Sequence, residues 1–429
     1  MSGTPMSVRP AAPGILPAGG AIAPASPPAA VASSPHPLRL PAFRRLWAGS
    51  AISLAGDQFY LVALPWVVLQ LTGSAVAMGT ILMTAAIPRA VLMLMGGALT
   101  DRLSARRILM ATATARAMVV GAVGALLWFR ALEVWHLYAL GFGFGVADAF
   151  AMPAGSALMP TLVARDQLVR ANSVMQTTAQ LTTIVGPAPA GLVIRSLGAA
   201  VAFILDAISF LFVIAALWSL PEPAQGQARS RTPMWRAVLD GIASVRQDAA
   251  LSALMLLAAM INVCVTGPMM VGLAVMAKTT FGSPAAYGFV VSSLAAGGLV
   301  GALVAGVWKI RRRGPFLLAA ATLIAVCVAS LGFIGQIWPV AIVLALMAAA
   351  SAATNIHLSA WIQARVDPSL RGRVLSVLML AAIGLMPVSL AAAGFLAAWS
   401  LKGMFVLAGA GMLTVTALAA TRPSVRAIE

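Results

Sequence analysis

Five ionisable side chains interrupt the long apolar segments of this 429-residue chain. They are Asp57, Arg89, Arg116, Asp148 and Asp206. Placing one such group at the centre of a bilayer costs about 2.5–3.5 kcal/mol, so five unpaired groups would cost on the order of 12–18 kcal/mol. They must therefore pair with one another or face water.

Three carboxylates stand against two guanidinium groups in this set, which leaves one carboxylate without a fixed counter-charge. A low dielectric disfavours the ionised form of such a group, so it can take up and release a proton. We therefore predict Asp57 and Asp148 as candidates for proton coupling. Arg89, Arg116 and Asp206 are their predicted charge partners inside the membrane.

A purely structural role is the alternative for each member of this set. Asp57, Asp148 and the two arginines would then form static ion pairs that hold the first four helices together. Asp206 would accept a hydrogen bond from neighbouring backbone or from Ser209.

The second half of the chain has no acid within any apolar segment. Its polar groups there are neutral, among them Asn262, Thr266, Asn355 and His357. For His357 a hydrogen-bonded structural role is favoured over a proton relay. Proton handling is therefore expected in the first half, and shape and polar contacts to a ligand in the second.

The elements that must position these groups follow from composition. With 61% hydrophobic and only 9% charged residues, the chain cannot cover the surface of a soluble globule. Apolar runs this long without alternation indicate spanning helices and exclude barrel strands. The sequence predicts an all-α integral membrane protein with twelve spans, at 46–71, 75–99, 108–129, 134–160, 171–194, 197–220, 249–277, 285–308, 314–334, 337–362, 374–400 and 403–420.

A polar interval divides the spans six and six, and an internal similarity between 163–170 and 364–371 supports two parallel repeats. We predict two six-helix bundles with tails and a linker on the cytoplasmic side. The predicted boundaries are a disordered tail at 1–40, a first bundle at 41–220, a linker at 221–248, a second bundle at 249–421 and a tail at 422–429.

The basic residues predict the orientation. Of the 28 Lys and Arg, 22 lie in the tails and in the loops on the side of the termini, and four lie in the opposite loops. Basic residues accumulate in cytoplasmic loops, so both termini are predicted in the cytoplasm and the chain in a plasma membrane, the inner membrane of a bacterium. The net charge of +17 is then a result of topology, and a nucleic-acid partner is not expected.

The sequence contains no nucleophile–base pair, no metal-spaced cluster and no phosphate loop. Its two cysteines, Cys264 and Cys327, lie inside apolar runs, which argues against a disulfide framework or a zinc site. We therefore expect no enzyme activity, no cofactor and no metal.

The connection between the second and third spans reads Gly96-Gly-Ala-Leu-Thr-Asp-Arg-Leu-Ser-Ala-Arg-Arg107. A glycine permits close helix approach, and the basic residues anchor at a membrane surface. This stretch resembles the loop G-x-x-x-D-R-x-G-R-R of the major facilitator superfamily. The resemblance implies a conformational-switch loop, whose matching residues are Gly97, Asp101, Arg102 and Arg106.

In the fifth span, Gly186-Pro-Ala-Pro-Ala-Gly191 resembles the G-P-x-x-G-G element of the drug:proton antiporters of this superfamily. Gly186, Pro187 and Gly191 match. The prolines free backbone carbonyls and kink the helix, and the glycines allow tight packing between bundles. This element favours export over uptake.

Three further stretches, 46–57, 205–210 and 370–374, are similar to the branch that includes bacterial enterobactin exporters and macrolide efflux proteins. The resemblance implies a monomeric, proton-coupled exporter of a small amphipathic molecule of the drug, macrolide or siderophore class. Two bundles would rock about a midplane cavity, which Phe59, Tyr60, Trp66 and Met residues could line. The alternatives are a lysolipid or nutrient importer on the same fold, and a transport-dead facilitator acting as a receptor.

Overall fold

The computed structural model describes residues 36–100, 103–221, 249–308, 310, 312–365 and 383–422, and this part of the chain is helical without strands. The first half contains η1 (Pro37–Arg39), α1 (Pro41–Thr72), α2 (Ala75–Thr100), α3 (Ala105–Trp128), α4 (Val134–Leu162), η2 (Arg165–Gln167), α5 (Leu168–Val185), α6 (Pro187–Leu197) and α7 (Ala199–Trp218). The second half contains α9 (Ala249–Gly267), η3 (Pro268–Gly272), α10 (Leu273–Met276), η4 (Ala277–Phe281), α11 (Pro284–Val307), α12 (Arg313–Ser330), η5 (Leu331–Phe333), α13 (Ile337–Arg365), α15 (Met386–Trp399) and α16 (Leu401–Ala420).

Ten helical segments in the described residues are long and apolar enough to cross a membrane. The all-helical membrane fold is confirmed. The fifth predicted span corresponds to α5 and α6, and α15 covers only the later part of the eleventh. The predicted tails and linker lie almost entirely outside the described residues.

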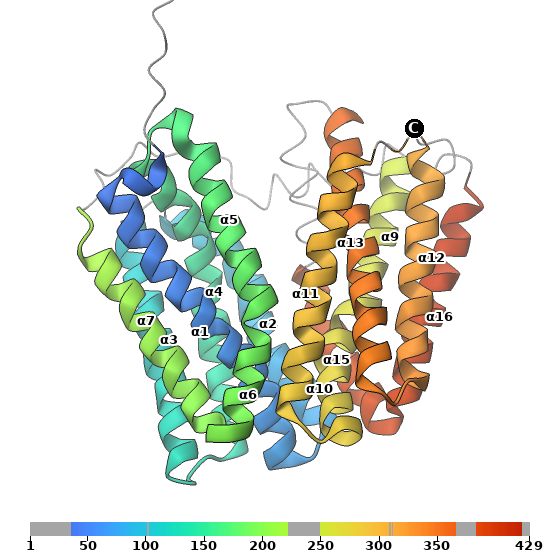
Figure 1. Ribbon diagram of the computed structural model, residues 1–429, viewed down its shortest axis with the longest axis horizontal. Coiled ribbons are helices and arrows are strands. Elements are labelled where there is room, and N and C mark those ends of the chain that lie inside the picture. Colours follow the sequence, from blue (N-terminus) through green and yellow to red (C-terminus); the bar gives the residue numbers. More distant parts are fainter. Residues whose placement is uncertain are drawn as a thin grey trace, which may run out of the picture. The chain divides into compact units, whose positions relative to one another are not determined.

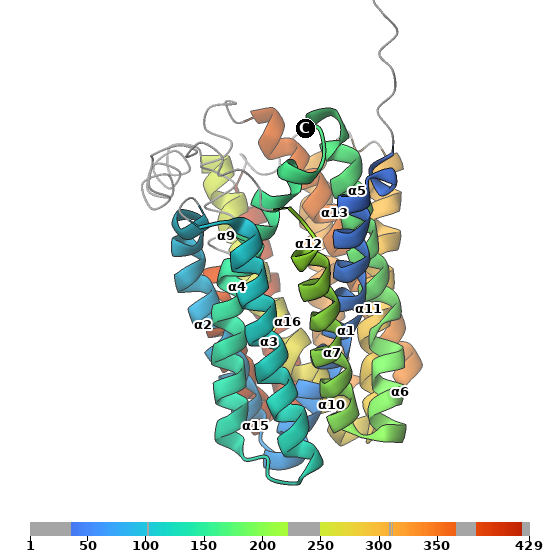
Figure 2. The same ribbon diagram turned by 90° about the vertical axis from the view of Figure 1, so that its left-hand side faces the viewer.

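The helices pack as two groups that follow the order of the chain. Helices α1 to α7 contact one another, and so do α9 to α16. Figures 1 and 2 show the helices running side by side, with the first group coloured blue to green and the second yellow to red. The most extensive contacts between the groups are those of α2 with α15 and of α6 with α11.

Close approach of backbones makes the contact between α2 and α15. A Cβ added at Gly79 would lie 2.5 Å from the carbonyl oxygen of Leu390 and 2.9 Å from the Cα of Gly394. In lipid there is no hydrophobic force between apolar helices, so small residues that let backbones touch supply the packing energy. This contact lies near the start of α2, on the side opposite to the termini.

Helices α6 and α11 also pack through close approach of their backbones, on the same side of the molecule. A Cβ at Gly191 would lie 2.5 Å from the carbonyl oxygen of Pro284, and one at Gly288 would collide with that of Pro187. Two of the matching antiporter-like residues, Pro187 and Gly191, therefore lie at the junction between the halves.

The fifth predicted span breaks at Gly186, where α5 ends and α6 begins. Gly186 keeps helical dihedrals (φ −67°, ψ −41°), so the break is a loss of hydrogen bonds rather than a reversal of the chain. Pro187 and Pro189 have no N–H to donate. The N–H of Ala188 between them donates to Oγ of Ser292 on α11, 3.2 Å away. The Ala188 N–H, which lies in the first turn of α6, is thus satisfied by a side chain of the other half of the molecule.

Two adjacent glycines of α11 provide a matched test of this packing. A Cβ at Gly297 would collide with the backbone of Ala345 on α13, whereas one at Gly298 would meet nothing within 4 Å. We expect Gly297→Ala to lower the free energy of unfolding by about 1–3 kcal/mol through overpacking. Gly298→Ala should leave it unchanged or raise it by up to about 1 kcal/mol through helix propensity. Thermal unfolding of both variants, followed by tryptophan fluorescence, checks this; equal midpoints would contradict the packing described.

Candidate functional site

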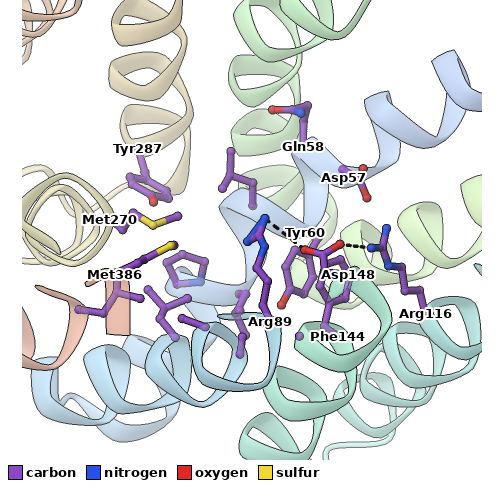
Figure 3. A pocket seen from close by; sticks show the side chains of 18 residues that line it. Asp57, Gln58, Tyr60, Arg89, Arg116, Phe144, Asp148, Met270, Tyr287 and Met386 are labelled. Atoms are coloured by element: carbon purple, nitrogen blue, oxygen red, sulfur yellow. Dashed lines mark hydrogen bonds and ion pairs between the residues drawn. The ribbon is translucent and has the colours of Figure 1, made fainter. Parts of the chain in front are cut away.

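The five predicted ionisable residues come from five different helices. Asp57 lies on α1, Arg89 on α2, Arg116 on α3, Asp148 on α4 and Asp206 on α7. The structure brings four of them, all except Asp206, to the wall of one cavity. Figure 3 shows the two arginines reaching toward the same carboxylate.

Both arginines pair with Asp148. Nη2 of Arg116 donates to Oδ1 of Asp148, and Nη2 of Arg89 lies 3.4 Å from Oδ2 of the same side chain. One carboxylate therefore serves two guanidinium groups and joins α2, α3 and α4. The Arg116 guanidinium also lies over the ring of Phe144, with Cζ 4.9 Å from its centroid.

Asp57 has no hydrogen bond or ion pair with any described residue, and its Oδ1 is buried without a partner. The count of charges predicted one carboxylate without a fixed counter-charge. In the described residues two carboxylates, Asp57 and Asp206, lack an ion pair. Because both guanidinium groups converge on Asp148, neither Asp57 nor Asp206 forms an ion pair with a described residue, although Arg116 still interacts electrostatically with both.

Asp206 is completely buried behind α1. Its Oδ1 accepts a long hydrogen bond of 3.4 Å from Oγ of Ser209, whose shorter bond of 2.7 Å goes to the Asp206 backbone carbonyl. Its Oδ2 has no partner among the described residues. A Cβ at Gly56 would lie 2.8 Å from Oδ1, so Asp206 packs directly against the residue that precedes Asp57.

The cavity has a volume of about 400 Å³ and both halves of the chain line it. Tyr60 stacks on Phe144 with ring centroids 4.4 Å apart and planes 6° from parallel. The second half contributes Met270, Tyr287, Met386 and Leu390. Met270, Tyr287 and Met386 of the second half lie opposite the charged residues and the Tyr60–Phe144 stack of the first half (Figure 3).

The sequence did not single out several of these lining residues. Met270 lies in the π-helical turn η3, and π-turns change which side chains face inward in a way that a 3.6-residue period cannot predict. Gln58, beside Asp57, donates from Nε2 to the Leu54 carbonyl at 3.2 Å and has a buried Oε1 without a described partner. Its polarity within an apolar span was the available signal.

Two aromatic residues expected at the cavity lie elsewhere. Phe59 and Trp66 are not among the lining residues. Trp66 instead stacks under the ammonium of Lys278 from the other half, with Nζ 4.6 Å from a ring centroid. This contact lies on the side of the molecule opposite to the termini.

The conformational-switch loop is described only in part. Asp101 and Arg102 lie outside the described residues, and Gly97 lies in the last turns of α2, where side-chain surroundings are not described. Arg106 donates from Nε to the Leu217 carbonyl at 2.7 Å and from Nη2 to the Trp218 carbonyl at 2.8 Å. It therefore satisfies carbonyls at the C-terminal end of α7.

Comparison with known proteins identifies the fold and the family. The family profile described as "Transmembrane secretion effector", within the major facilitator superfamily, matches residues 32–429. The chain belongs to this family. It is therefore a multi-pass membrane transporter rather than an enzyme.

Similar curated proteins are efflux pumps. The multidrug efflux pump Tap of Mycolicibacterium fortuitum is 30% identical over 92% of this chain and 97% of its own length. Macrolide efflux protein A of Streptococcus pyogenes is 26% identical over 65% and 69% of the two chains, and the enterobactin exporter EntS of Escherichia coli O1:K1 / APEC is 26% identical over 78% and 80%. The predicted resemblance to macrolide and enterobactin exporters is confirmed, and the transporter is an exporter of small molecules.

A solved structure supports the same fold. The nucleoside transporter NupG superposes with a TM-score of 0.73 at 11% identity, over 89% of this chain and 98% of its own. At this identity the likeness concerns the fold alone.

The shared carboxylate generates a prediction about stability. Asp148→Asn leaves two guanidinium groups without an ion-pair partner and should lower the free energy of unfolding by about 2 kcal/mol. This is less than for a fully buried pair, because the Arg89 and Asp148 side chains are 35% and 17% exposed. Asp57→Asn breaks no ion pair and should lower the free energy of unfolding by less than Asp148→Asn does. Thermal unfolding of the two purified variants checks this. A larger loss for Asp57→Asn than for Asp148→Asn would contradict the pairing.

Proposed function

We propose that this exporter is proton-coupled and moves a small amphipathic molecule of the drug, macrolide or siderophore class by alternating access. The observation that carries the proposal is the Asp57 carboxylate, which lines the cavity without an ion pair among the described residues, while Asp148 pairs with both arginines. The two predicted bundles, 41–220 and 249–421, would move about this cavity.

Asp57 is the carboxylate best suited to carry the proton. An unpaired carboxylate away from bulk water is costly in its ionised form, and a proton from the cavity removes that cost. Asp148 is neutralised by Arg89 and Arg116, so protonating it would leave two cations uncompensated. Asp206 does not line the cavity and acts as a buried neighbour of Asp57.

The contacts between the halves support alternating access. The glycine contacts of α2 with α15 and of α6 with α11 lie on the side opposite to the termini. They contain no ion pair among the described residues, so separation of the halves there breaks no ion pair. Residues from both halves line the cavity, so this movement changes its access and shape.

The distribution of basic residues supports an orientation with both termini in the cytoplasm and a location in the bacterial inner membrane. In that orientation the glycine contacts lie toward the extracytoplasmic surface of the membrane. We propose that the transporter acts as a monomer, since the cavity is complete within one chain.

The cavity wall supports an amphipathic substrate. Tyr60, Phe144 and Tyr287 offer flat apolar surfaces, and Met270 and Met386 offer flexible ones that adapt to different shapes. The names of the relatives, which cover multidrug, macrolide and enterobactin export, support the same class.

Inverted membrane vesicles with an imposed proton gradient test the proposal. Macrolides, catecholate siderophores, lipophilic cations and lysolipids are added in turn, and collapse of the gradient is recorded. We expect wild type to respond to at least one of the first three classes, Asp57→Asn to lose the response, and Asp57→Glu, which keeps a titratable group, to retain part of it.

Two results would count against this assignment. Full proton-driven transport by Asp57→Asn would remove Asp57 as the coupling site. A folded, inserted wild type that responds only to lysolipids, or to nothing in the panel, would contradict the proposed substrate class.

A further inference from the structure

A second cavity lies on the outer surface of the second half, away from the charged site. It has a volume of about 320 Å³ and is bounded by α11, α12 and α13. It shares no lining residue with the central cavity. The lining is apolar apart from one histidine, and its residues include Val300, Val304, Phe316, Leu323, Ala353 and His357. We call it the α11–α13 groove.

The groove lies at the depth of the acyl chains in one leaflet. Its α12 wall runs from Phe316 to Leu323, which is about 5–15 Å from the first residue of α12 at 1.5 Å per residue. The start of α12 is on the same side of the molecule as both termini. Val300 and Val304 on the opposite wall are 57% and 49% exposed, so the groove is accessible from outside the protein.

A buried polar atom without a partner lies at the floor of this groove. His357 is only 9% exposed, and its Nε2 has no hydrogen-bond partner among the described residues. Its ring packs edge-on against Phe316 at a centroid distance of 5.2 Å. The hydrogen-bonded role favoured by the sequence is therefore not fulfilled at this nitrogen by the described residues. Buried polar groups are nearly always paired, so this atom points to a ligand.

The mouth of the groove is positively charged. Arg312 is the N-cap residue of α12 and Arg313 is its first residue, about one turn before Phe316. The first turn of α12 contains no acid. No described acid forms an ion pair with either arginine. Trp308, 63% exposed, also lines the mouth, where amphipathic rings favour the headgroup region.

We propose that the α11–α13 groove binds an anionic phospholipid from the leaflet on the side of the termini. One acyl chain lies over α13 between α11 and α12. The phosphate binds Arg312 and Arg313, and Nε2–H of His357 donates to an ester carbonyl just below the headgroup. Because no carboxylate is among the described residues that line the groove, it does not suit a cationic ligand.

Native mass spectrometry of the purified full chain tests this site. The protein is offered equal amounts of phosphatidylglycerol and phosphatidylcholine with identical acyl chains. We expect wild type to retain phosphatidylglycerol in preference by at least about tenfold. Both lipids carry the phosphate, but the quaternary ammonium of phosphatidylcholine cancels its charge and is repelled by the two arginines. Arg312→Gln with Arg313→Gln should abolish that preference.

The matched control removes two positive charges from the same side of the protein. The double variant Arg39→Gln, Arg44→Gln alters exposed residues of η1 and α1, which do not line the groove. It should leave the preference for phosphatidylglycerol unchanged. An equal loss in this control, or equal retention of the two lipids by wild type, would overturn the proposal. Millimolar inorganic phosphate should not displace the lipid; displacement would identify a phosphate-ion site instead.

A second pair of variants tests the groove itself. Ala353→Phe fills the floor and should reduce retention of phosphatidylglycerol about tenfold, and His357→Phe keeps the ring volume while removing the donor and should reduce it less. Unchanged retention in Ala353→Phe, with the protein folded by tryptophan fluorescence, would contradict binding in the groove. If Ala353→Phe does not fold, the Arg312→Gln, Arg313→Gln double variant carries the test.

Discussion

Two guanidinium groups that share one carboxylate organise the charged centre of this protein. Inside a bilayer each unpaired charge is costly, so Arg89 and Arg116 must find an anion, and both find Asp148. This convergence binds α2, α3 and α4 around one point. It also leaves Asp57 at the cavity wall without an ion pair. Asp148 therefore has the structural role, and Asp57 has the proposed functional one.

The contacts between the two halves have a different physical basis. Glycines on α2, α6, α11 and α15 let backbones touch, and Ser292 satisfies the N–H of Ala188 between two prolines. In lipid such contacts are favourable but modest, because apolar helices gain no hydrophobic energy from one another. An interface of this kind can hold one conformation and still separate, as alternating access requires.

The two cavities differ in chemistry in a way that matches different ligands. The central cavity combines charge with aromatic and methionine side chains from both halves, which suits a transported amphipathic molecule. The α11–α13 groove belongs to one half and is apolar apart from His357, and Arg312 and Arg313 lie at the start of α12 near its mouth. Cargo and membrane lipid would therefore contact separate surfaces, and a lipid in the groove would move with the second half as a body.

Much of this protein follows from its sequence alone. Uninterrupted apolar length determined the spanning helices, and two prolines after Gly186 marked the break in the fifth span. Four of the five ionisable residues that the sequence singled out line the central cavity. The family was recognisable from short motifs. The pairing of the charges was decided only by the tertiary structure: a count of acids and bases predicted one lone carboxylate, and the fold leaves two. Segments that are apolar all round show that a helix crosses the membrane but not which face it turns inward, so Met270, Tyr287 and Met386 could be assigned to the cavity only once the helices were packed.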